Sequence, residues 1–163
     1  EELTSLGAHL SHLPVDPRIG KMMIMGAIFG CLEPVLIIAA GMAHRDPFVL
    51  PLDKKQAADE AKRSFAGGTC SDHLALLRAY QGWRKAFRSG GAGAAHEYCW
   101  RNFLSMNTMQ MMQDMVVQFA DLIQDIGFLT SGHPGVAEEE GSRQLGGAQA
   151  YQAPGRQRGG WAR

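Results

Sequence analysis

The 163-residue sequence has few cysteines and no excess of charge of either sign. Cys31, Cys70 and Cys99 are too few and too far apart for a disulfide framework, so we expect free thiols in a reducing compartment. Sixteen Lys and Arg residues balance sixteen Asp and Glu residues. This balance excludes a protein that binds nucleic acid through a strongly basic tail, and it excludes a strongly acidic, highly solvated protein. Any contact with a nucleic acid must therefore use a local basic patch.

The sequence also lacks a clear membrane span. Its most apolar stretch, Met22–Ala43, carries Glu33 in its middle, and a carboxylate at the centre of a bilayer costs at least ~2.5 kcal/mol. Two buried helices joined at Gly30–Pro34 explain this stretch better. The first residue is Glu1, with no basic and apolar leader after it. We therefore expect an intracellular fragment, nuclear or cytoplasmic, of a longer protein.

Motifs for nucleotide binding and for nucleophilic catalysis are missing as well. The phosphate-binding pattern GxxxxGK[ST] does not occur, and no serine stands in a strand-to-helix elbow motif. We therefore expect this chain to contain no catalytic residue, no bound cofactor and no ATP-hydrolysing site.

Two Cys–His pairs raise the question of zinc. Cys70 and His73 lie three residues apart, as do His96 and Cys99, so together they could supply a Cys2His2 set. Zinc sites usually pair Cys with Cys and His with His, whereas both pairs here are mixed. Free cysteines are commonly core residues. Burial or capping is the favoured interpretation, and we predict no metal site.

Apolar residues recur with a helical period through most of the chain. Asp16-Pro17 is typical of an N-cap followed by Pro at the first helical position, and Ser71 can cap a later helix. Gly67-Gly68, Ser89–Gly93 and Gly127 are expected to interrupt or end helices. The expected helices are Arg18–Phe29, Val35–Ala43, Asp53–Phe65, the segment from Ser71 to Phe87, His96–Leu104 and Asn107–Ile126.

The composition changes near residue 130. From Ser131 to Arg163 the sequence is Gly-rich, contains the acidic run Glu138–Glu140 and has almost no aliphatic residues. Such a segment cannot bury enough apolar area to offset the entropy lost on ordering. We therefore expect an all-α helical bundle followed by a disordered Gly/Arg-rich tail over residues 130–163. The one candidate for extended chain is a short piece at Leu13–Val15.

The most informative patch lies between Leu74 and Arg101, a segment that contains five basic residues and only one acidic residue. Basic residues interleaved with aromatic ones can follow a phosphate backbone and stack bases. The alternative is a solvated helix face whose aromatic residues turn into the core. For Tyr80 and Trp83 the core interpretation is favoured, and for the charges both interpretations stay open. The five basic residues are Arg78, Arg84, Lys85, Arg88 and Arg101.

Five segments of the chain follow one another in a recognisable order. They are LTSLGAHLSHLPVDPRIGKMMIMGAIFGCLEPVLIIAA (Leu3–Ala40), DPFVLPL (Asp46–Leu52), KKQAADEAKRSFA (Lys54–Ala66), SDHLALLRAYQGWRKA (Ser71–Ala86) and YCWRNFLSMNTMQMMQDMVVQF (Tyr98–Phe119). Together they closely resemble the C-terminal helicase-associated region of eukaryotic DExH-box ATP-dependent RNA helicases. The resemblance covers about Leu3–Leu129.

The resemblance implies a domain organisation. In that family two RecA-like motor domains precede a winged helix, a ratchet-like helical domain and an OB-fold, and single-stranded RNA passes between the motor and these domains. Residues 1–31 would then be the C-terminal part of the winged helix, and residues 32–129 the ratchet bundle. ATP and Mg²⁺ would belong to the motor domains of the parent helicase. The implied partners are RNA, single-stranded or structured, and the parent's motor domains and OB-fold, with no membrane partner.

Two functions are compatible with this organisation. The first is an accessory RNA-contacting module that guides single-stranded RNA while motor domains absent from this chain unwind it. The second is a free-standing helical interaction domain, derived from such a helicase, that docks a protein through Met-rich faces. Methionines cluster between Met22 and Met25 and between Met106 and Met115. Their helical spacing favours core residues over an open groove.

The family's RNA channel implies RNA contacts on this domain, and the sequence suggests where they lie. Residues 71–73 begin a helix, and the N–H groups at a helix N-terminus can bind phosphate. Basic residues farther along the same helix could extend the contact, and Arg101-Asn102 should stay outside the core. The candidate RNA-binding residues are Ser71, His73, Arg84, Lys85, Arg101 and Asn102.

The missing motifs lead to a first prediction. The purified 163-residue chain should show no RNA-stimulated ATP hydrolysis, because the phosphate-binding loop and the Mg²⁺-binding carboxylates of that chemistry are absent. The measurement is release of inorganic phosphate from ATP with and without single-stranded RNA. Turnover that stays stoichiometric with this chain through purification would show the prediction to be wrong.

Overall fold

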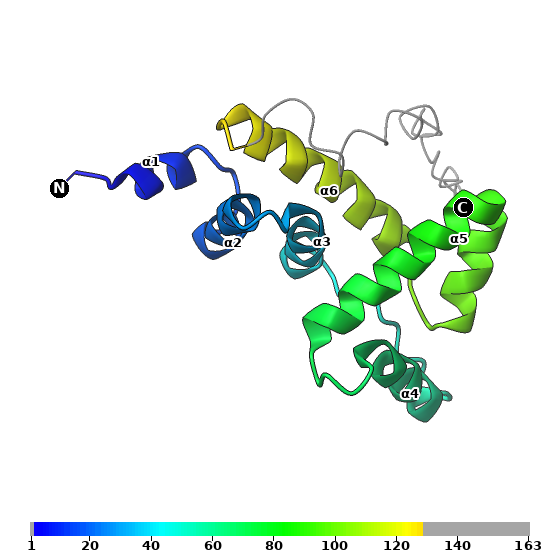
Figure 1. The fold of residues 1–163 in the computed structure, drawn as a ribbon. Coiled ribbons are helices and arrows are strands. Elements are labelled where there is room, and N and C mark those ends of the chain that lie inside the picture. The colour runs from blue at the N-terminus through cyan, green and yellow to red at the C-terminus, as the bar shows by residue number, and fades with distance from the viewer. Residues whose placement is uncertain (1, 129–163) are drawn as a thin grey trace, which may run out of the picture.

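The computed structural model describes residues 2–128 and places six helices there (Figure 1). Their bounds are α1 Ser5–Ser11, α2 Pro17–Ile28, α3 Leu32–Ala43, α4 Lys55–Ala66, α5 Asp72–Arg101 and α6 Met106–Asp125. Over residues 2–128 the only β-type pairing is an isolated bridge between Phe48 and Leu104. The predicted all-α bundle is confirmed, and the predicted disordered tail lies outside the described residues. Within 2–128 no helix has both the length and the apolar character that crossing a bilayer requires.

The start of α2 follows the sequence pattern. The Asp16 carboxylate accepts a hydrogen bond from the Arg18 N–H at 2.8 Å, and Pro17 occupies the first turn. Gly30 then adopts a φ of +69°, which turns the chain toward α3. Helix α3 begins at Leu32, three residues before the expected Val35. Pro34 is compatible with this earlier start because the first turn of a helix leaves its N–H groups without intrahelical partners.

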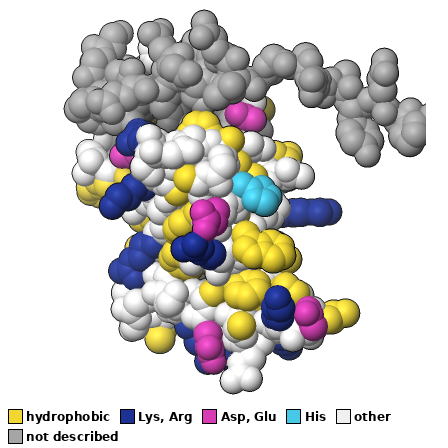
Figure 2. All heavy atoms as spheres, turned by 90° about the vertical axis from the view of Figure 1, so that its right-hand side faces the viewer, with side chains coloured by type: hydrophobic (Ala, Val, Ile, Leu, Met, Phe, Trp, Pro, Cys, Tyr) yellow, Lys and Arg dark blue, Asp and Glu magenta, His cyan; other side chains and the backbone are white. Residues whose placement is uncertain are grey.

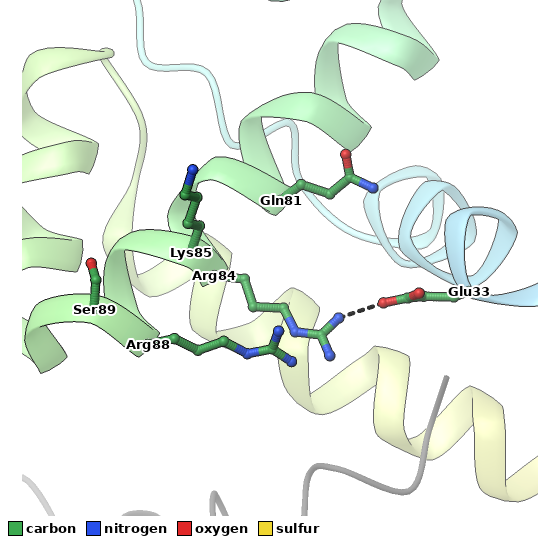
Figure 3. A pocket seen from close by; sticks show the side chains of 6 residues that line it. All are labelled: Glu33, Gln81, Arg84, Lys85, Arg88 and Ser89. Carbon is green, nitrogen blue, oxygen red and sulfur yellow. Dashed lines mark hydrogen bonds and ion pairs between the residues drawn. The ribbon is translucent and has the colours of Figure 1, made fainter. Parts of the chain in front are cut away.

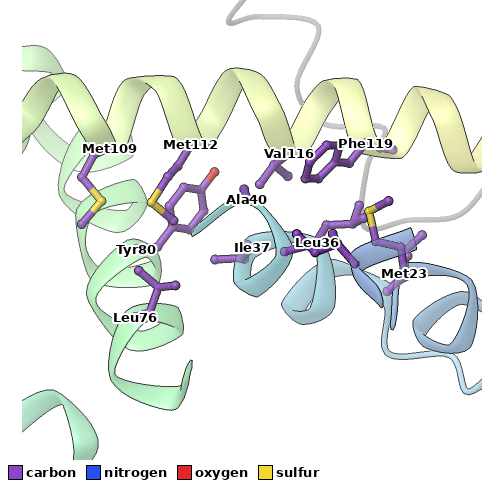
Figure 4. Close-up of a cluster of buried hydrophobic side chains, with 14 of the residues drawn as sticks. Met23, Leu36, Ile37, Ala40, Leu76, Tyr80, Met109, Met112, Val116 and Phe119 are labelled. Atoms are coloured by element: carbon purple, nitrogen blue, oxygen red, sulfur yellow. The ribbon is translucent and has the colours of Figure 1, made fainter. Parts of the chain in front are cut away.

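Helix α3 is the centre of the core. Leu36, Ile37 and Ala40 are buried, and in Figure 4 they face side chains from α2, α5 and α6. The helices pack closely at two glycines. A Cβ on Gly26 of α2 would lie 2.9 Å from the Val35 Cβ, and one on Gly41 would lie 3.2 Å from the Leu76 Cγ. Both positions therefore favour glycine.

Methionines of both clusters belong to this core. Met23 of α2 and Met109 and Met112 of α6 are completely buried, and Figure 4 shows Met112 beside Tyr80 of α5. The core interpretation of the methionines is confirmed at these positions. Met111, in contrast, is about half exposed.

Helix α5 has two arms. Gly90 and Gly91 leave the helical region of backbone angles, with a φ of +67° at Gly91, so the predicted interruption at Ser89–Gly93 is confirmed. The second arm turns back along the first (Figure 1). A Cβ on Gly82 of the first arm would lie 2.6 Å from the Tyr98 Cζ of the second. A glycine at position 82 therefore lets the Tyr98 ring lie against the first arm.

Trp83 lies on the inner side of the first arm. It is 4% exposed, and its indole N–H donates to the Met106 sulfur at 3.3 Å. The core interpretation of Trp83 and of the fully buried Tyr80 is confirmed.

Helix α4 is attached to the rest of the bundle through α5 and the loop before it. Arg78 of α5 donates hydrogen bonds of 2.8 Å to the carbonyl oxygens of Phe65 and Ala66, which end α4. The Phe48 and Phe65 rings lie 5.9 Å apart, and the Lys62 ammonium lies 5.1 Å from the centre of the Phe48 ring. These contacts hold the N-terminal end of α5 in place.

The N-terminal segment differs from its prediction. Helix α1 was not expected, and Leu13–Val15 forms bends instead of a strand, with the Leu13 N–H bonded to the Leu10 carbonyl at 3.1 Å. A helix of seven residues is too short for the apolar period to be recognised. Its start is set locally, because the Thr4 hydroxyl accepts from the Gly7 N–H.

The contact between the two arms of α5 gives a stability prediction. Gly82→Ala should lower the free energy of unfolding by ~1–3 kcal/mol, because the added methyl group displaces the Tyr98 ring from a packed site. Gly93→Ala is the matched control. A Cβ on Gly93 meets no atom of the described chain within 4 Å, so this substitution should be neutral or stabilising by up to ~1 kcal/mol. Urea unfolding followed by circular dichroism measures the stability of both variants. Equal unfolding midpoints for Gly82→Ala and Gly93→Ala would refute the proposed packing of Tyr98 against Gly82.

Candidate nucleic-acid interface

All six candidate RNA contacts lie on α5 or at its two ends. Ser71 is the N-cap, and its hydroxyl accepts a hydrogen bond from the Leu74 N–H at 3.3 Å. His73 is exposed in the first turn. Asp72 stands between them, 3.8 Å from the Lys62 ammonium, and brings a negative charge to this helix start. A phosphate here would meet the N–H groups of the first turn together with one opposing carboxylate.

A polar pocket of about 400 Å³ lies beside the first arm of α5 (Figure 3). Five of its lining residues recur along one face of α5, and the sixth comes from the first turn of α3. The lining residues are Glu33, Gln81, Arg84, Lys85, Arg88 and Ser89. The structure therefore brings the sequence candidates Arg84 and Lys85 together and adds Arg88 to them.

Arg84 has a structural role in the pocket. Its guanidinium donates to the Glu33 carboxylate at 2.6 Å, and the Arg84 side chain is only 16% exposed. This ion pair connects α5 to the start of α3. Lys85 and Arg88 are exposed, and no hydrogen bond or ion pair joins either side chain to another residue within 2–128. Within this part of the chain their charges have no opposing partner.

The candidates at the C-terminal end of α5 differ in availability. Arg101 is exposed and pairs with Glu97, which lies one turn earlier and is also exposed. Such surface pairs contribute little stability and are easily exchanged for another anion. The Asn102 amide donates to the Tyr98 carbonyl at 2.8 Å and Asn102 is half-buried, so that N–H group closes the helix end. Asn102 is therefore less free than the sequence suggested.

Trp100 is the exposed aromatic side chain of this region. It is 76% exposed, whereas its neighbour Cys99 is 2% exposed. His96 and Trp100 lie four residues apart on the second arm, and both are exposed. On the face that Figure 2 shows, basic side chains are scattered among acidic and apolar ones. The surface therefore offers individual cations and an aromatic ring to a ligand.

The interface also includes Arg88, Glu33 and Trp100, which were not among the six candidate RNA-binding residues from the sequence. Arg88 could have been found, because it lies one turn after Arg84 and Lys85 on the same helix. Glu33 could not have been placed there, since 51 residues separate it from Arg84 in the chain.

The mixed Cys–His pairs do not form a metal site in the part of the chain that the structure describes. Within 2–128 no group of three or more His, Cys, Asp or Glu side chains is arranged to hold a metal ion. Cys70 is exposed, with a φ of +50°, whereas Cys99 is buried with its sulfur 3.9 Å from the Met106 sulfur. Burial raises the pKa of the Cys99 thiol from 9.0 to about 11, which disfavours the thiolate that a metal requires.

Several known proteins are similar in sequence to this chain. Residues 16–76 match the family described as "Helicase associated domain (HA2), ratchet-like". The DExH-box ATP-dependent RNA helicase DExH1 of Arabidopsis thaliana is 59% identical over 134 residues, which are 82% of this chain and 13% of that protein. The human ATP-dependent DNA/RNA helicase DHX36 is 49% identical over 134 residues, again 82% and 13%. The human putative ATP-dependent RNA helicase DHX57 is 50% identical over 132 residues, 81% of this chain and 9% of that protein.

These matches confirm the resemblance found in the sequence. Residues 16–76 are a ratchet-like helicase-associated domain, and over 82% of its length the chain is similar to eukaryotic ATP-dependent helicases, among them the DExH-box RNA helicase DExH1. The chain spans only 13% of the length of DExH1 and DHX36 and 9% of the length of DHX57. The family match begins at residue 16 and includes α2 as well as α3. The division at residue 31 between a winged helix and the ratchet stays a prediction.

Burial of Cys99 gives a prediction for thiol chemistry. At pH 8 Cys31 and Cys70 should react rapidly with a disulfide reagent, whereas Cys99 should react only after unfolding, because its side chain is buried and its pKa is about 11. We expect two thiols per chain to react rapidly in the native protein and the third to react only in urea. Three rapid equivalents in the native protein would contradict the buried position.

The same pKa fixes the sign of a pH effect on stability. The folded-state pKa of Cys99 lies above the unfolded value, so its contribution is fully present below pH 9 and is lost as the pH rises toward 11. The midpoint of urea unfolding should fall over this range. In Cys99→Ala the fall should be smaller, and an unchanged pH profile would argue against burial of this thiol.

Proposed function

We propose that this chain is an accessory RNA-contacting module of a DExH-box RNA helicase, which guides single-stranded RNA during ATP-driven unwinding. Motor domains elsewhere in the parent protein would bind ATP and Mg²⁺ and supply the motion. Membership of the helicase-associated family supports this proposal. The observation that carries it is the exposure of Lys85, Arg88 and Arg101, together with Trp100, on α5.

These side chains have the chemistry that single-stranded RNA requires. Lys and Arg neutralise backbone phosphates and release bound counterions, and an exposed aromatic ring can stack on an unpaired base. Among the candidates from the sequence, the side chains of His73, Lys85 and Arg101 are exposed to solvent. Ser71, Arg84 and Asn102 also have structural partners, and we assign them the role of shaping the surface.

A protein-docking domain is the alternative. Its Met-rich groove would need open methionines, whereas Met23, Met109 and Met112 are completely buried. This observation favours the RNA-contacting function.

The proposal predicts a change in salt dependence when Arg101 is replaced. Arg101→Ala should weaken binding to all single-stranded RNA sequences alike, and the slope of log affinity against log salt should decrease by about one. Fluorescence anisotropy with a labelled RNA over a range of KCl concentrations measures both quantities. Arg63→Ala, which removes an exposed cation from α4, is the control and should leave the slope unchanged.

RNA binding by the unmodified 163-residue chain decides between the two functions. Weak, salt-sensitive binding of single-stranded RNA supports the RNA-contacting module. Absence of RNA binding at low salt would overturn it and would favour the docking domain. Equal slopes for the parent and Arg101→Ala would remove Arg101 from the RNA path.

A further inference from the structure

The pocket beside α5 has an uneven balance of charge. Its lining contains Arg84, Lys85 and Arg88 but only one carboxylate, Glu33, so three positive charges and one negative charge leave a net charge of +2. Figure 3 shows the Arg84 and Arg88 side chains extending from α5 in the same direction, with Arg84 pointing to Glu33. Neighbouring guanidinium groups repel each other unless anions lie close to them. Glu33 compensates Arg84, and Arg88 has no anionic partner within the described chain.

The side chains of the pocket indicate which kind of anion could bind to Arg88. A guanidinium is planar and offers N–H groups in a fork that fits two oxygens of one phosphate, and a lysine adds a mobile point charge. The Ser89 hydroxyl and the Gln81 amide line the same pocket and add polar groups at its edge. A volume of about 400 Å³ is ample for a phosphate group with part of its sugar. A carboxylate of a protein partner would meet the same cations.

We propose that this pocket binds a backbone phosphate of RNA through Arg88 and Lys85, with Glu33 as a positioning residue that holds Arg84 beside Arg88. The inference rests on the proposed function and names the RNA group that the pocket takes. Arg88 is then a direct contact, whereas the sequence placed it in the basic patch but not among the six candidate RNA-binding residues. Glu33 lowers the positive charge of the pocket by one and fixes one of its walls.

The first experiment compares two double variants that remove the same charges. Lys85→Ala/Arg88→Ala alters the pocket, and Lys55→Ala/Arg63→Ala removes one exposed Lys and one exposed Arg from α4. Anisotropy with a labelled single-stranded RNA should show that the pocket variant loses about two units of salt slope, one for each contact. The α4 variant should retain the parent slope. Circular dichroism and protection of the Cys99 thiol show whether each variant is folded.

The second experiment isolates the role of Glu33. Glu33→Gln keeps a carbonyl oxygen for the Arg84 guanidinium and removes the negative charge, so the net charge of the pocket rises from +2 to +3. We expect tighter RNA binding and a salt slope that is steeper by about one. An unchanged slope would overturn the statement that Glu33 lowers the charge of the pocket and would leave Glu33 a positioning residue only. Weaker binding would show that Arg84 needs the Glu33 carboxylate to stay in place.

A third experiment separates RNA phosphate from free phosphate. Inorganic phosphate and KCl are compared as competitors of RNA binding at matched ionic strength. Phosphate should compete more strongly than chloride with the unmodified chain, and this difference should shrink in Lys85→Ala/Arg88→Ala. The same difference in both proteins would overturn the phosphate pocket.

The outcomes separate the two proposals. RNA binding that is the same in the pocket variant and the α4 variant overturns the phosphate pocket and leaves the RNA-contacting function in place. If the unmodified chain binds no RNA, the proposed function and the RNA-phosphate pocket both fail. A titration with inorganic phosphate, followed by amide chemical shifts at Arg88 and Ser89, then shows whether the pocket binds free phosphate instead.

Discussion

Helix α3 has no polar face, and the positions of the other helices follow from covering it. Leu36, Ile37, Ala39 and Ala40 are buried on different sides of this helix, against α2, α5 and α6. Full burial of one Leu or Ile side chain contributes about 1.5–3 kcal/mol, so the removal of α3 from water is a large term in the stability of the bundle. Gly26 and Gly41 allow α2 and α5 to approach it closely.

The bend in α5 links this core to the surface that we assign to RNA. Gly90 and Gly91 reverse the helix, and packing of Tyr98 against Gly82 fixes the second arm. The first arm buries Trp83 and exposes Lys85, while the second buries Cys99 and exposes Trp100. One helix therefore contributes to the core and to the interface at adjacent positions, and substitutions on its inner side would alter the interface indirectly.

The Glu33–Arg84 ion pair is where core and surface meet. Glu33 lies in the first turn of α3, and its partner lies in the middle of the first arm of α5. Because Arg84 is largely buried, removing only one partner would leave a charge poorly solvated and would be more damaging than breaking an exposed pair. The pair also joins two walls of the pocket, since Glu33 comes from α3 and Arg84 from α5.

The sequence by itself determined the helical class, most helix positions and the family. Local signals sufficed, since Asp16-Pro17 starts α2, Ser71 caps α5 and the stripe through Trp83 marks the core. It could not reveal that Glu33 faces Arg84 or that Trp100 is exposed. The helical spacing of the apolar residues shows which face of a helix a residue lies on. Which side chain it contacts depends on how that face packs against a helix distant in sequence. Only the packing of α5 on α3 decided which cations are paired and which remain available, because ion pairing requires proximity in space.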